Sequence, residues 1–224
     1  MTALGELLST TTHEFNNVLT TVINYAKLGM RHKDAPTRDK ALEKIHEAGQ
    51  RAAKITNGVL AFAKNRKETI EPTDLRRVIE DSMLLLEREM QKYKVRVEYQ
   101  LSHAPPASAI GNQIQQVLIN LLVNARQAMP DGGQLTIKLS HDDASNTVDL
   151  QIRDTGSGMS QETMKRIFDP YFSTKSGPDA SGKGGTGLGL SACRSIIEAH
   201  RGRIRVESAP GKGTAFTIKL PVAQ

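Results

Sequence analysis

The sequence predicts an α+β protein in which a long antiparallel helical hairpin forms a dimeric four-helix bundle and precedes an α/β sandwich domain. Two patterns predict this fold. Over residues 2–66, apolar and small residues recur at alternating spacings of three and four, which is the repeat of supercoiled helices. From residue 95 onward, segments that alternate apolar and polar residues are separated by helical stretches, which indicates a layer of strands against a layer of helices.

The helical region contains two repeats separated by a short break at Asp34–Thr37, which suits an antiparallel hairpin. The residues expected along the seam are Leu4, Leu8, Thr11, Phe15, Val18, Val22, Tyr25 and Gly29 in the first repeat, and Leu42, Ile45, Gly49, Ala52, Thr56, Val59 and Ala63 in the second. One hairpin cannot bury this seam alone, so we expect a homodimer. The alternative is that the hairpin packs on the rest of its own chain.

The rest of the chain alternates between helices and strands. A polar connector at 67–73 leads to a helix that begins at Thr73 or Asp74 and reaches about Gln91. We expect antiparallel strands at 95–101, 134–140, 147–153, 203–207 and 214–220, helices at 112–128, 160–168 and 188–199, and hairpin turns at 131–133 and 210–213. The expected organisation is a helical domain at 1–66, a linker at 67–73 and a second domain at 74–224.

Composition narrows the class of protein. Apolar residues make up 38% of the 224 residues but aromatic residues only 4%, so the core must be aliphatic. No apolar run approaches the roughly 18 residues of a membrane span, and no leader pattern is seen, so we expect a cytoplasmic segment without membrane contact. The net charge of +6 comes from basic residues that are spread among acidic ones, which does not favour nucleic acid. The single cysteine, Cys193, is expected to be a buried, inert thiol.

Two asparagines are the first candidate ligands. Asn120 and Asn124 lie four residues apart, so they share one face of the expected helix. An amide oxygen can ligate Mg²⁺ that already carries phosphate oxygens, without adding charge. The alternative is a solvated helix face, but the surrounding residues are unusually apolar. We therefore expect Asn124 and Asn120 to lie at a magnesium site.

A glycine-containing loop follows the strand that ends near Asp154. A buried carboxylate at this position can accept a hydrogen bond from the exocyclic amine of adenine, whereas guanine presents a carbonyl there and would be rejected. Gly156 and Gly158 would let the backbone approach the base closely. An ordinary Asp-Thr-Gly turn is the alternative reading of these residues.

The glycine-rich segment at 176–189 runs into an expected helix. Such a composition predicts a mobile lid, and glycine amides at the start of a helix suit phosphate binding. The expected nucleotide-binding residues in and beside this segment are Lys175, Gly185, Thr186, Gly187, Leu188 and Gly189. Together with the preceding motifs they predict a site for ATP and Mg²⁺.

The remaining candidate site lies near the start of the sequence, at His13. In the heptad phase of the first helix it falls at the most outward position, which disfavours a core histidine and leaves an idle surface histidine as the alternative. A neutral imidazole can attack phosphorus, and the adjacent Glu14 can accept its other proton. Asn17 lies one turn later on the same face. We therefore expect His13 to be the nucleophile and Glu14 to be the base.

These motifs together resemble the kinase core of sensor histidine kinases. Residues 120–124, 154–158, 168–172, 185–190 and 211–216 are similar to its N, G1, F, G2 and G3 boxes, and residues 13–17 to its H box. The H box lacks the usual helix-kinking proline. The resemblance covers essentially the whole chain and implies a GHKL-type ATP-binding domain after a dimerisation and histidine phosphotransfer domain.

The resemblance also implies an activity and partners. ATP would phosphorylate His13, and the phosphoryl group would pass to an aspartate in the receiver domain of a response regulator. Asn124 would hold magnesium with Asn120 beside it, Asp154 would read adenine, and Gly187 and Gly189 would contact phosphates. Asn17 would orient water for regulator dephosphorylation, and a sensor domain would precede this chain. An ATP-gated conformational module without phosphotransfer and a degenerate, scaffolding kinase are the alternative functions.

Overall fold

The computed structural model describes residues 3–32, 34–64, 69–174 and 188–223. The chain forms two compact units, one over residues 4–64 and one over residues 65–224 together with the first three residues. Within the described residues, no helix is both long and apolar enough to cross a membrane. The two units are described separately.

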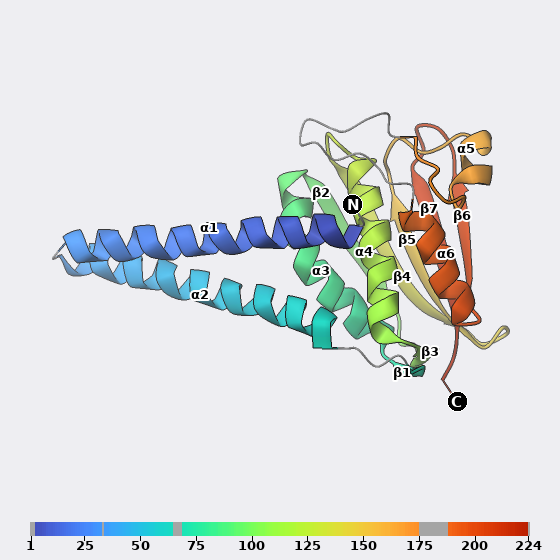
Figure 1. The fold of residues 1–224 in the computed structure, drawn as a ribbon, viewed down its shortest axis with the longest axis horizontal. Coiled ribbons are helices and arrows are strands. Elements are labelled where there is room, and N and C mark those ends of the chain that lie inside the picture. Colours follow the sequence, from blue (N-terminus) through green and yellow to red (C-terminus); the bar gives the residue numbers. More distant parts are fainter. Residues whose placement is uncertain (1–2, 33, 65–68, 175–187, 224) are drawn as a thin grey trace. The chain divides into compact units, whose positions relative to one another are not determined.

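The first unit is the predicted helical hairpin. Helices α1 (Ala3–Arg31) and α2 (Ala35–Lys64) lie side by side and antiparallel (Figure 1). The chain turns at Asp34, whose side chain accepts a hydrogen bond from the Thr37 backbone N–H at 3.0 Å and so caps α2. Near this turn the helices approach closely. A Cβ added to Gly29 would lie only 3.3 Å from the Cβ of Ala41, so a larger residue would crowd the contact.

The seam within this hairpin differs from the prediction on α2. Ala41 and Ala48 are buried together with Val18 of α1, whereas the predicted seam residue Leu42 is 61% exposed and Gly49 is exposed. The contact inside one hairpin therefore lies one position away from the heptad seam assigned to α2. A two-helix contact covers a narrower stripe than a bundle core, and this leaves part of the apolar surface of both helices uncovered.

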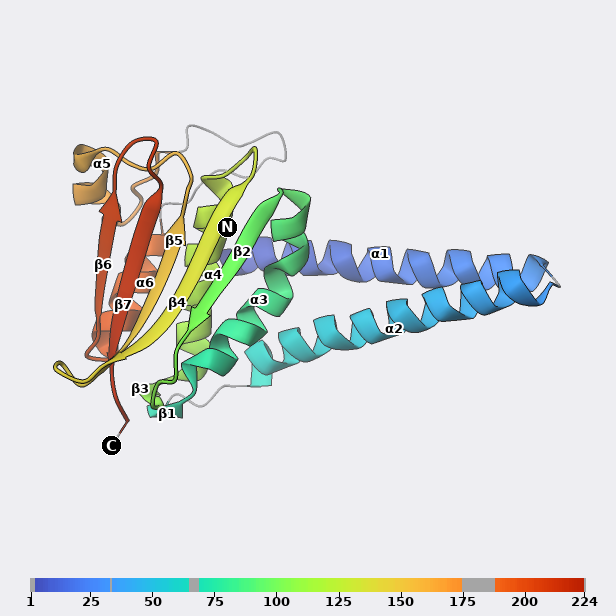
Figure 2. The same ribbon diagram turned by 180° about the vertical axis from the view of Figure 1, so that it is seen from behind.

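The second unit is built on a five-stranded sheet with strand order β2-β4-β5-β7-β6 (Figure 2). The strands are β2 (Val95–Leu101), β4 (Gly133–Asp142), β5 (Thr147–Asp154), β6 (Arg203–Ser208) and β7 (Thr214–Pro221). The predicted positions are confirmed within a few residues. The expectation of a purely antiparallel sheet is wrong, because β2 pairs with β4 in parallel.

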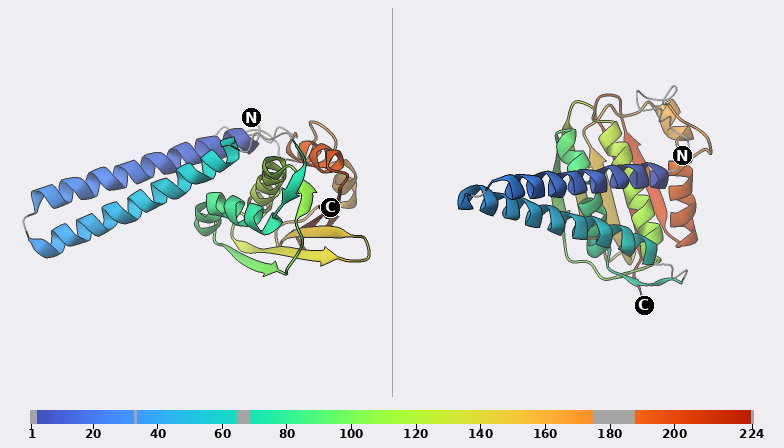
Figure 3. Two further views of the ribbon diagram at one scale, coloured as in Figure 1. Left: turned by 90° about the horizontal axis from the view of Figure 1, so that it is seen from below. Right: turned by 60° about the vertical axis from the view of Figure 1, so that its left-hand side comes forward.

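Helices α3 (Leu75–Lys92), α4 (Gly111–Gln127) and α6 (Gly189–Ala199) cover one face of this sheet (Figure 3). A short helix, α5 (Gln161–Arg166), lies at one end of the sheet. Asp74 is the N-cap of α3, as one of the two predicted candidates, and accepts hydrogen bonds from the backbone of Arg76 and Arg77. The core between the layers is aliphatic, as composition predicted, with fully buried residues that include Ile79, Leu118 and Ile137.

Two very short strands were not predicted. β1 (Glu71–Thr73) pairs antiparallel with β3 (Ala107–Ala109), and the Thr73 hydroxyl donates to the Ala109 carbonyl at 2.8 Å. Part of the segment expected as a polar connector is therefore paired with the second unit. Ala107 also forms a β-bridge with Val222, so the chain leading into α4 is held on both sides.

One of the two predicted hairpin turns is wrong. Residues 131–133 connect α4 to β4, so this turn joins a helix to a strand. A glycine is nevertheless favoured in this turn, because Gly132 has a φ of 102°, a conformation that other residues rarely adopt. Residues 210–213 do join the antiparallel strands β6 and β7, as predicted.

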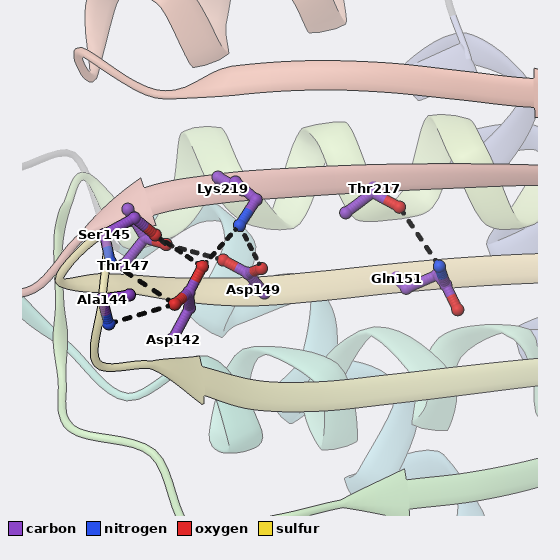
Figure 4. A network of polar contacts seen from close by, with 8 residues as sticks. All are labelled: Asp142, Ala144, Ser145, Thr147, Asp149, Gln151, Thr217 and Lys219. Atoms are coloured by element: carbon purple, nitrogen blue, oxygen red, sulfur yellow. Dashed lines mark hydrogen bonds and ion pairs between the residues drawn. The ribbon is translucent and has the colours of Figure 1, made fainter.

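A polar network closes the end of the sheet at the β4–β5 turn (Figure 4). The Lys219 ammonium lies 2.9 Å from Asp142 and 2.7 Å from Asp149. Hydrogen bonds from Ser145 and then from Lys219 hold the pKa of Asp142 far below its ordinary value. The network joins β4, β5 and β7 at the end of the sheet opposite Asp154, so it offers control positions outside the candidate site.

Candidate functional site

The two predicted asparagines lie on α4 in different environments. Asn120 is buried, and its amide nitrogen donates to the Cys193 thiol on α6 at 3.6 Å, whereas Asn124 is only partly buried. Cys193 is buried, as predicted, and this burial raises its pKa to about 12, which disfavours the reactive thiolate. Asn120 thus connects two helices, and Asn124 has the more accessible side chain of the two. The role of both residues at a metal ion stays a prediction.

Asp154 ends β5 and is 3% exposed. Its Oδ1 accepts hydrogen bonds from the backbone N–H groups of Gly156 at 2.8 Å and Thr214 at 3.2 Å. Burial raises the pKa of Asp154, and these backbone hydrogen bonds oppose the increase. Among the described residues both of these bonds go to Oδ1, so Oδ2 can accept a further hydrogen bond. This arrangement fits an acceptor for an exocyclic amine.

The two glycines after Asp154 are required by the protein's own backbone. A Cβ added to Gly156 would lie 2.5 Å from the carbonyl oxygen of Ala128, just beyond α4. Gly158 has a φ of 65°, and an added Cβ would collide with the carbonyl of Ala209. The Ser157 N–H also donates to the Ala128 carbonyl at 3.1 Å. These close approaches fix the loop against the end of α4, and no sequence motif indicated a role for Ala128.

The start of α6 lies beside Asn120. Leu188 is the N-cap, Gly189 is the first helical residue, and a Cβ added to Gly189 would lie 4.0 Å from the Asn120 side-chain carbon Cγ. The first N–H groups of a helix favour an anion such as a phosphate. The predicted residues Lys175, Gly185, Thr186 and Gly187 lie outside the residues that the structure describes.

The structure therefore brings together three predicted parts on one side of the second unit. Asn120 and the start of α6 are adjacent, and the loop after Asp154 touches the end of the same helix α4 that carries Asn124. Thr214 lies in the segment 211–216 that resembles the G3 box but was not one of the predicted site residues, and its backbone N–H supports Asp154. Within the described residues no cluster of three or more His, Cys, Asp or Glu side chains could hold a metal ion. Amide oxygens such as those of Asn120 and Asn124 are of a type that can ligate Mg²⁺ together with phosphate oxygens.

The predicted catalytic residues lie on the other unit. His13, Glu14 and Asn17 belong to α1, which is helical without interruption from Ala3 to Arg31, in agreement with the absence of a proline. Helical geometry places His13 and Asn17 one turn apart on a common face. Their side chains lie outside the described part of the structure.

Comparison with known families assigns both units. Residues 3–68 match the His Kinase A (phospho-acceptor) domain family, and residues 109–224 match the histidine kinase-, DNA gyrase B- and HSP90-like ATPases. The chain belongs to the sensor histidine kinase family. The predicted family and fold class are thereby confirmed, and the ATPase match agrees with the site around Asp154.

Individual relatives agree with this family. The chain is 35% identical to the sensor kinase CckA of Brucella abortus over 99% of its own length and 24% of that protein. It is 32% identical to the C4-dicarboxylate transport sensor protein DctS of Rhodobacter capsulatus, over 100% of its own length and 34% of that protein. The chain thus spans about a quarter to a third of these relatives.

Solved structures of histidine kinases share the fold. The catalytic domain of histidine kinase ThkA matches with a TM-score of 0.59 and 28% identity, over 68% of this chain and 95% of that one. ThkA in complex with the response regulator protein TrrA matches with a TM-score of 0.57 and 25% identity, over 98% of this chain and 62% of that one. These matches support the architecture of a helical unit followed by an ATPase unit.

Proposed function

We propose that this chain is the kinase core of a two-component system, which phosphorylates itself on His13 with ATP and passes the phosphoryl group to an aspartate of a response regulator. The observation that carries the proposal is the presence, in one chain, of a phospho-acceptor domain match that contains His13 and an ATPase match that contains Asp154. We propose a division into a dimerisation and phosphotransfer domain at 1–66, a linker at 67–73 and a catalytic ATP-binding domain at 74–224. The boundary between the two compact units near residue 65 supports the separation of the two domains, and the pairing of β1 with β3 attaches the last three linker residues to the ATP-binding domain.

The proposed chemistry follows from the residue types. The unprotonated nitrogen of the His13 imidazole attacks the γ-phosphorus of ATP, a nitrogen–phosphorus bond forms, and ADP leaves with the electrons of the broken oxygen–phosphorus bond. Glu14 takes the proton from the second ring nitrogen and offsets the positive charge. Magnesium, held through Asn124 with Asn120 beside it, would neutralise the phosphate charge. Asp154 would hold the adenine, and the start of α6 the phosphates.

The test uses γ-labelled ATP and the intact chain. A phosphohistidine is a phosphoramidate, so we expect a label on the protein that is stable in alkali and lost in acid. An ATP-gated conformational module would hydrolyse ATP without labelling the protein. A response regulator receiver domain added to the labelled protein should then take the label on an aspartate, which gives an acyl phosphate with a different stability.

We also propose that the helical hairpin dimerises into a four-helix bundle. Leu19, Ile23 and Met30 of α1 and Leu42 of α2 are large apolar residues that are exposed in the single hairpin. Those on α1 lie one position beyond the predicted seam residues Val18, Val22 and Gly29 and follow the same spacing. A second hairpin seated on this stripe would bury it, and each such side chain contributes about 1.5–3 kcal/mol when fully buried.

The dimer proposal predicts that charge on this stripe separates the subunits. In the double variant Ile23→Glu/Leu42→Glu, the dimer interface would bury unpaired carboxylates. We therefore expect this variant to be a monomer and the wild type to be a dimer. Light scattering coupled to gel filtration measures the mass directly. The matched control is Lys40→Glu, because Lys40 is exposed on α2 and points away from Leu42. A double variant that remains dimeric would contradict the proposed interface.

Asn17 is proposed to position the water that dephosphorylates the regulator. It lies one helical turn after His13, within reach of a group docked on that histidine. We expect Asn17→Ala to lose about 10- to 100-fold of regulator phosphatase activity while His13 phosphorylation is retained, because only an orienting hydrogen bond is removed. The measurement follows decay of a phosphorylated regulator with and without the kinase core. If the phosphorylated regulator decayed at the same rate with the wild type and with Asn17→Ala, Asn17 would have no role in dephosphorylation.

A further inference from the structure

His200 lies in the core of the ATPase unit and has no role in the proposed phosphotransfer. It is 2% exposed and is the C-cap of α6. Its Nε2 accepts a hydrogen bond from the backbone N–H of Ile110 at 2.9 Å, and its Nδ1 lies 2.7 Å from the Ile196 carbonyl oxygen. A backbone N–H can only donate and a carbonyl can only accept. The ring must therefore be neutral, with its proton on Nδ1.

The hydrogen bond from Ile110 joins two helices that carry the candidate site. Ile110 is the N-cap of α4 and has no side-chain cap, so the imidazole ties the beginning of α4 to the end of α6. The second tie is the contact of Asn120 with Cys193, nearer the start of α6. The two helices lie side by side on one face of the sheet (Figure 1). These two hydrogen bonds lie at different positions along the helices. Together they hold the distance between the helices constant and prevent one helix from sliding along the other.

Both ends of the His200 bridge are themselves held in place. Ile110 directly follows β3, which is paired with β1 and bridged to Val222. On the other side, the Gly202 N–H donates to the Ile197 carbonyl at 2.9 Å, and an added Cβ on Gly202 would lie 2.6 Å from the Lys219 carbonyl oxygen. A hydrogen bond between two fixed segments transmits position, whereas one between mobile segments would only follow their motion.

We propose that His200 is a positioning residue for nucleotide binding, whose neutral imidazole locks α6 to α4 so that the start of α6 and the N-box asparagines face the same nucleotide. This inference deepens the proposed function and rests on ATP binding by this unit. His200 is only 2% exposed, so it acts on the nucleotide through Ile110 and not by direct contact. Loss of the acceptor at Nε2 leaves the Ile110 N–H without its partner and lets the two helices shift relative to each other.

Two amide variants separate the two hydrogen bonds of the ring. In His200→Asn the amide nitrogen replaces Nδ1 and can still donate to Ile196, but nothing reaches Ile110. In His200→Gln the longer side chain places its amide oxygen near the position of Nε2, where it can accept from Ile110. We expect His200→Asn to weaken the binding of Mg²⁺-ATP about tenfold and His200→Gln to stay within about threefold of wild type, measured by calorimetry on the whole chain.

The outcomes are distinguishable. A lowered melting temperature with unchanged ATP affinity in both variants would show a purely structural histidine and overturn the proposal, as would an equal loss of affinity in both. Nitrogen chemical shifts of the His200 ring in the wild type give a test that needs no variant, because a proton on Nε2 would also overturn it. If wild type itself bound no ATP, the proposed function would fail before any variant was compared.

Discussion

Replacing His13 with alanine is expected to abolish phosphorylation of the chain while ATP binding remains. The imidazole nitrogen is the proposed nucleophile, and alanine has no group that can form a bond to phosphorus. ATP affinity should stay near that of the wild type, because His13 lies on α1 of the helical unit and Asp154 lies in the ATPase unit. The measurement pairs labelling by γ-labelled ATP with calorimetric titration of the same protein.

The control for this variant is His32→Ala. His32 follows α1 and is exposed, and its Nδ1 lies 3.7 Å from the Asp34 carboxylate. We expect it to label like wild type, since a solvated histidine near the hairpin turn has no part in the reaction. Acid-labile label that survives in His13→Ala would place the phosphoryl group elsewhere and contradict the proposed role.

The sequence predicted most of the architecture because its long elements repeat. The two helices of the hairpin and the strands β4, β5 and β7 each contain enough residues for a period to be read. Asp74 could be predicted as an N-cap because a capping carboxylate acts on residues immediately after it. Local signals of this kind lie within one element and need no knowledge of its neighbours.

What the sequence could not predict depends on pairing between distant segments. Alternation in β2 is the same whether its neighbour runs parallel or antiparallel, so the parallel pairing with β4 left no local signal. The strands β1 and β3 have three residues each, too few for a period. The one-position difference on α2 has a similar origin, because a heptad does not say which part of the stripe meets which partner.

The candidate site shows the same division. Asn120, Asn124 and Asp154 were found from linear motifs, since each motif lies within one turn or one loop. The support for Asp154 by Thr214, and for the loop by Ala128, comes from residues that only the fold brings close. Gly156 and Gly158 were predicted from the space needed by a base, and their nearest constraints are backbone carbonyls of the protein itself.

Replacing Asp154 with asparagine is expected to give the largest loss of ATP binding. Asparagine has nearly the same shape, so its oxygen can still accept from the N–H groups of Gly156 and Thr214. Its amide nitrogen then takes the place of Oδ2 and presents a donor to the donor amine of adenine. A hydrogen bond to a charged group is worth about 1.5–3 kcal/mol, so affinity for ATP should fall about 10- to 150-fold.

The matched control is Asp149→Asn on the same strand β5. Asp149 is a partly buried carboxylate that pairs with Lys219 at 2.7 Å in the network at the other end of the sheet (Figure 4). We expect this variant to unfold at a lower temperature, because Lys219 loses a charged partner, and to bind ATP like wild type. If both variants weakened ATP binding equally, the loss would come from the sheet and would not support base recognition by Asp154.

The same substitution should also change the choice of base. Guanine presents a carbonyl oxygen where adenine presents its amine, so the buried carboxylate of wild type faces an acceptor, whereas the amide nitrogen of Asp154→Asn faces a group it can bind. In this variant the affinity for ATP should fall while the affinity for GTP rises. The ratio of the two affinities should therefore change by a larger factor than the affinity for ATP does. Competition of both nucleotides against a fluorescent ATP analogue measures this ratio. An unchanged ratio would mean that Asp154 supports the loop without reading the base.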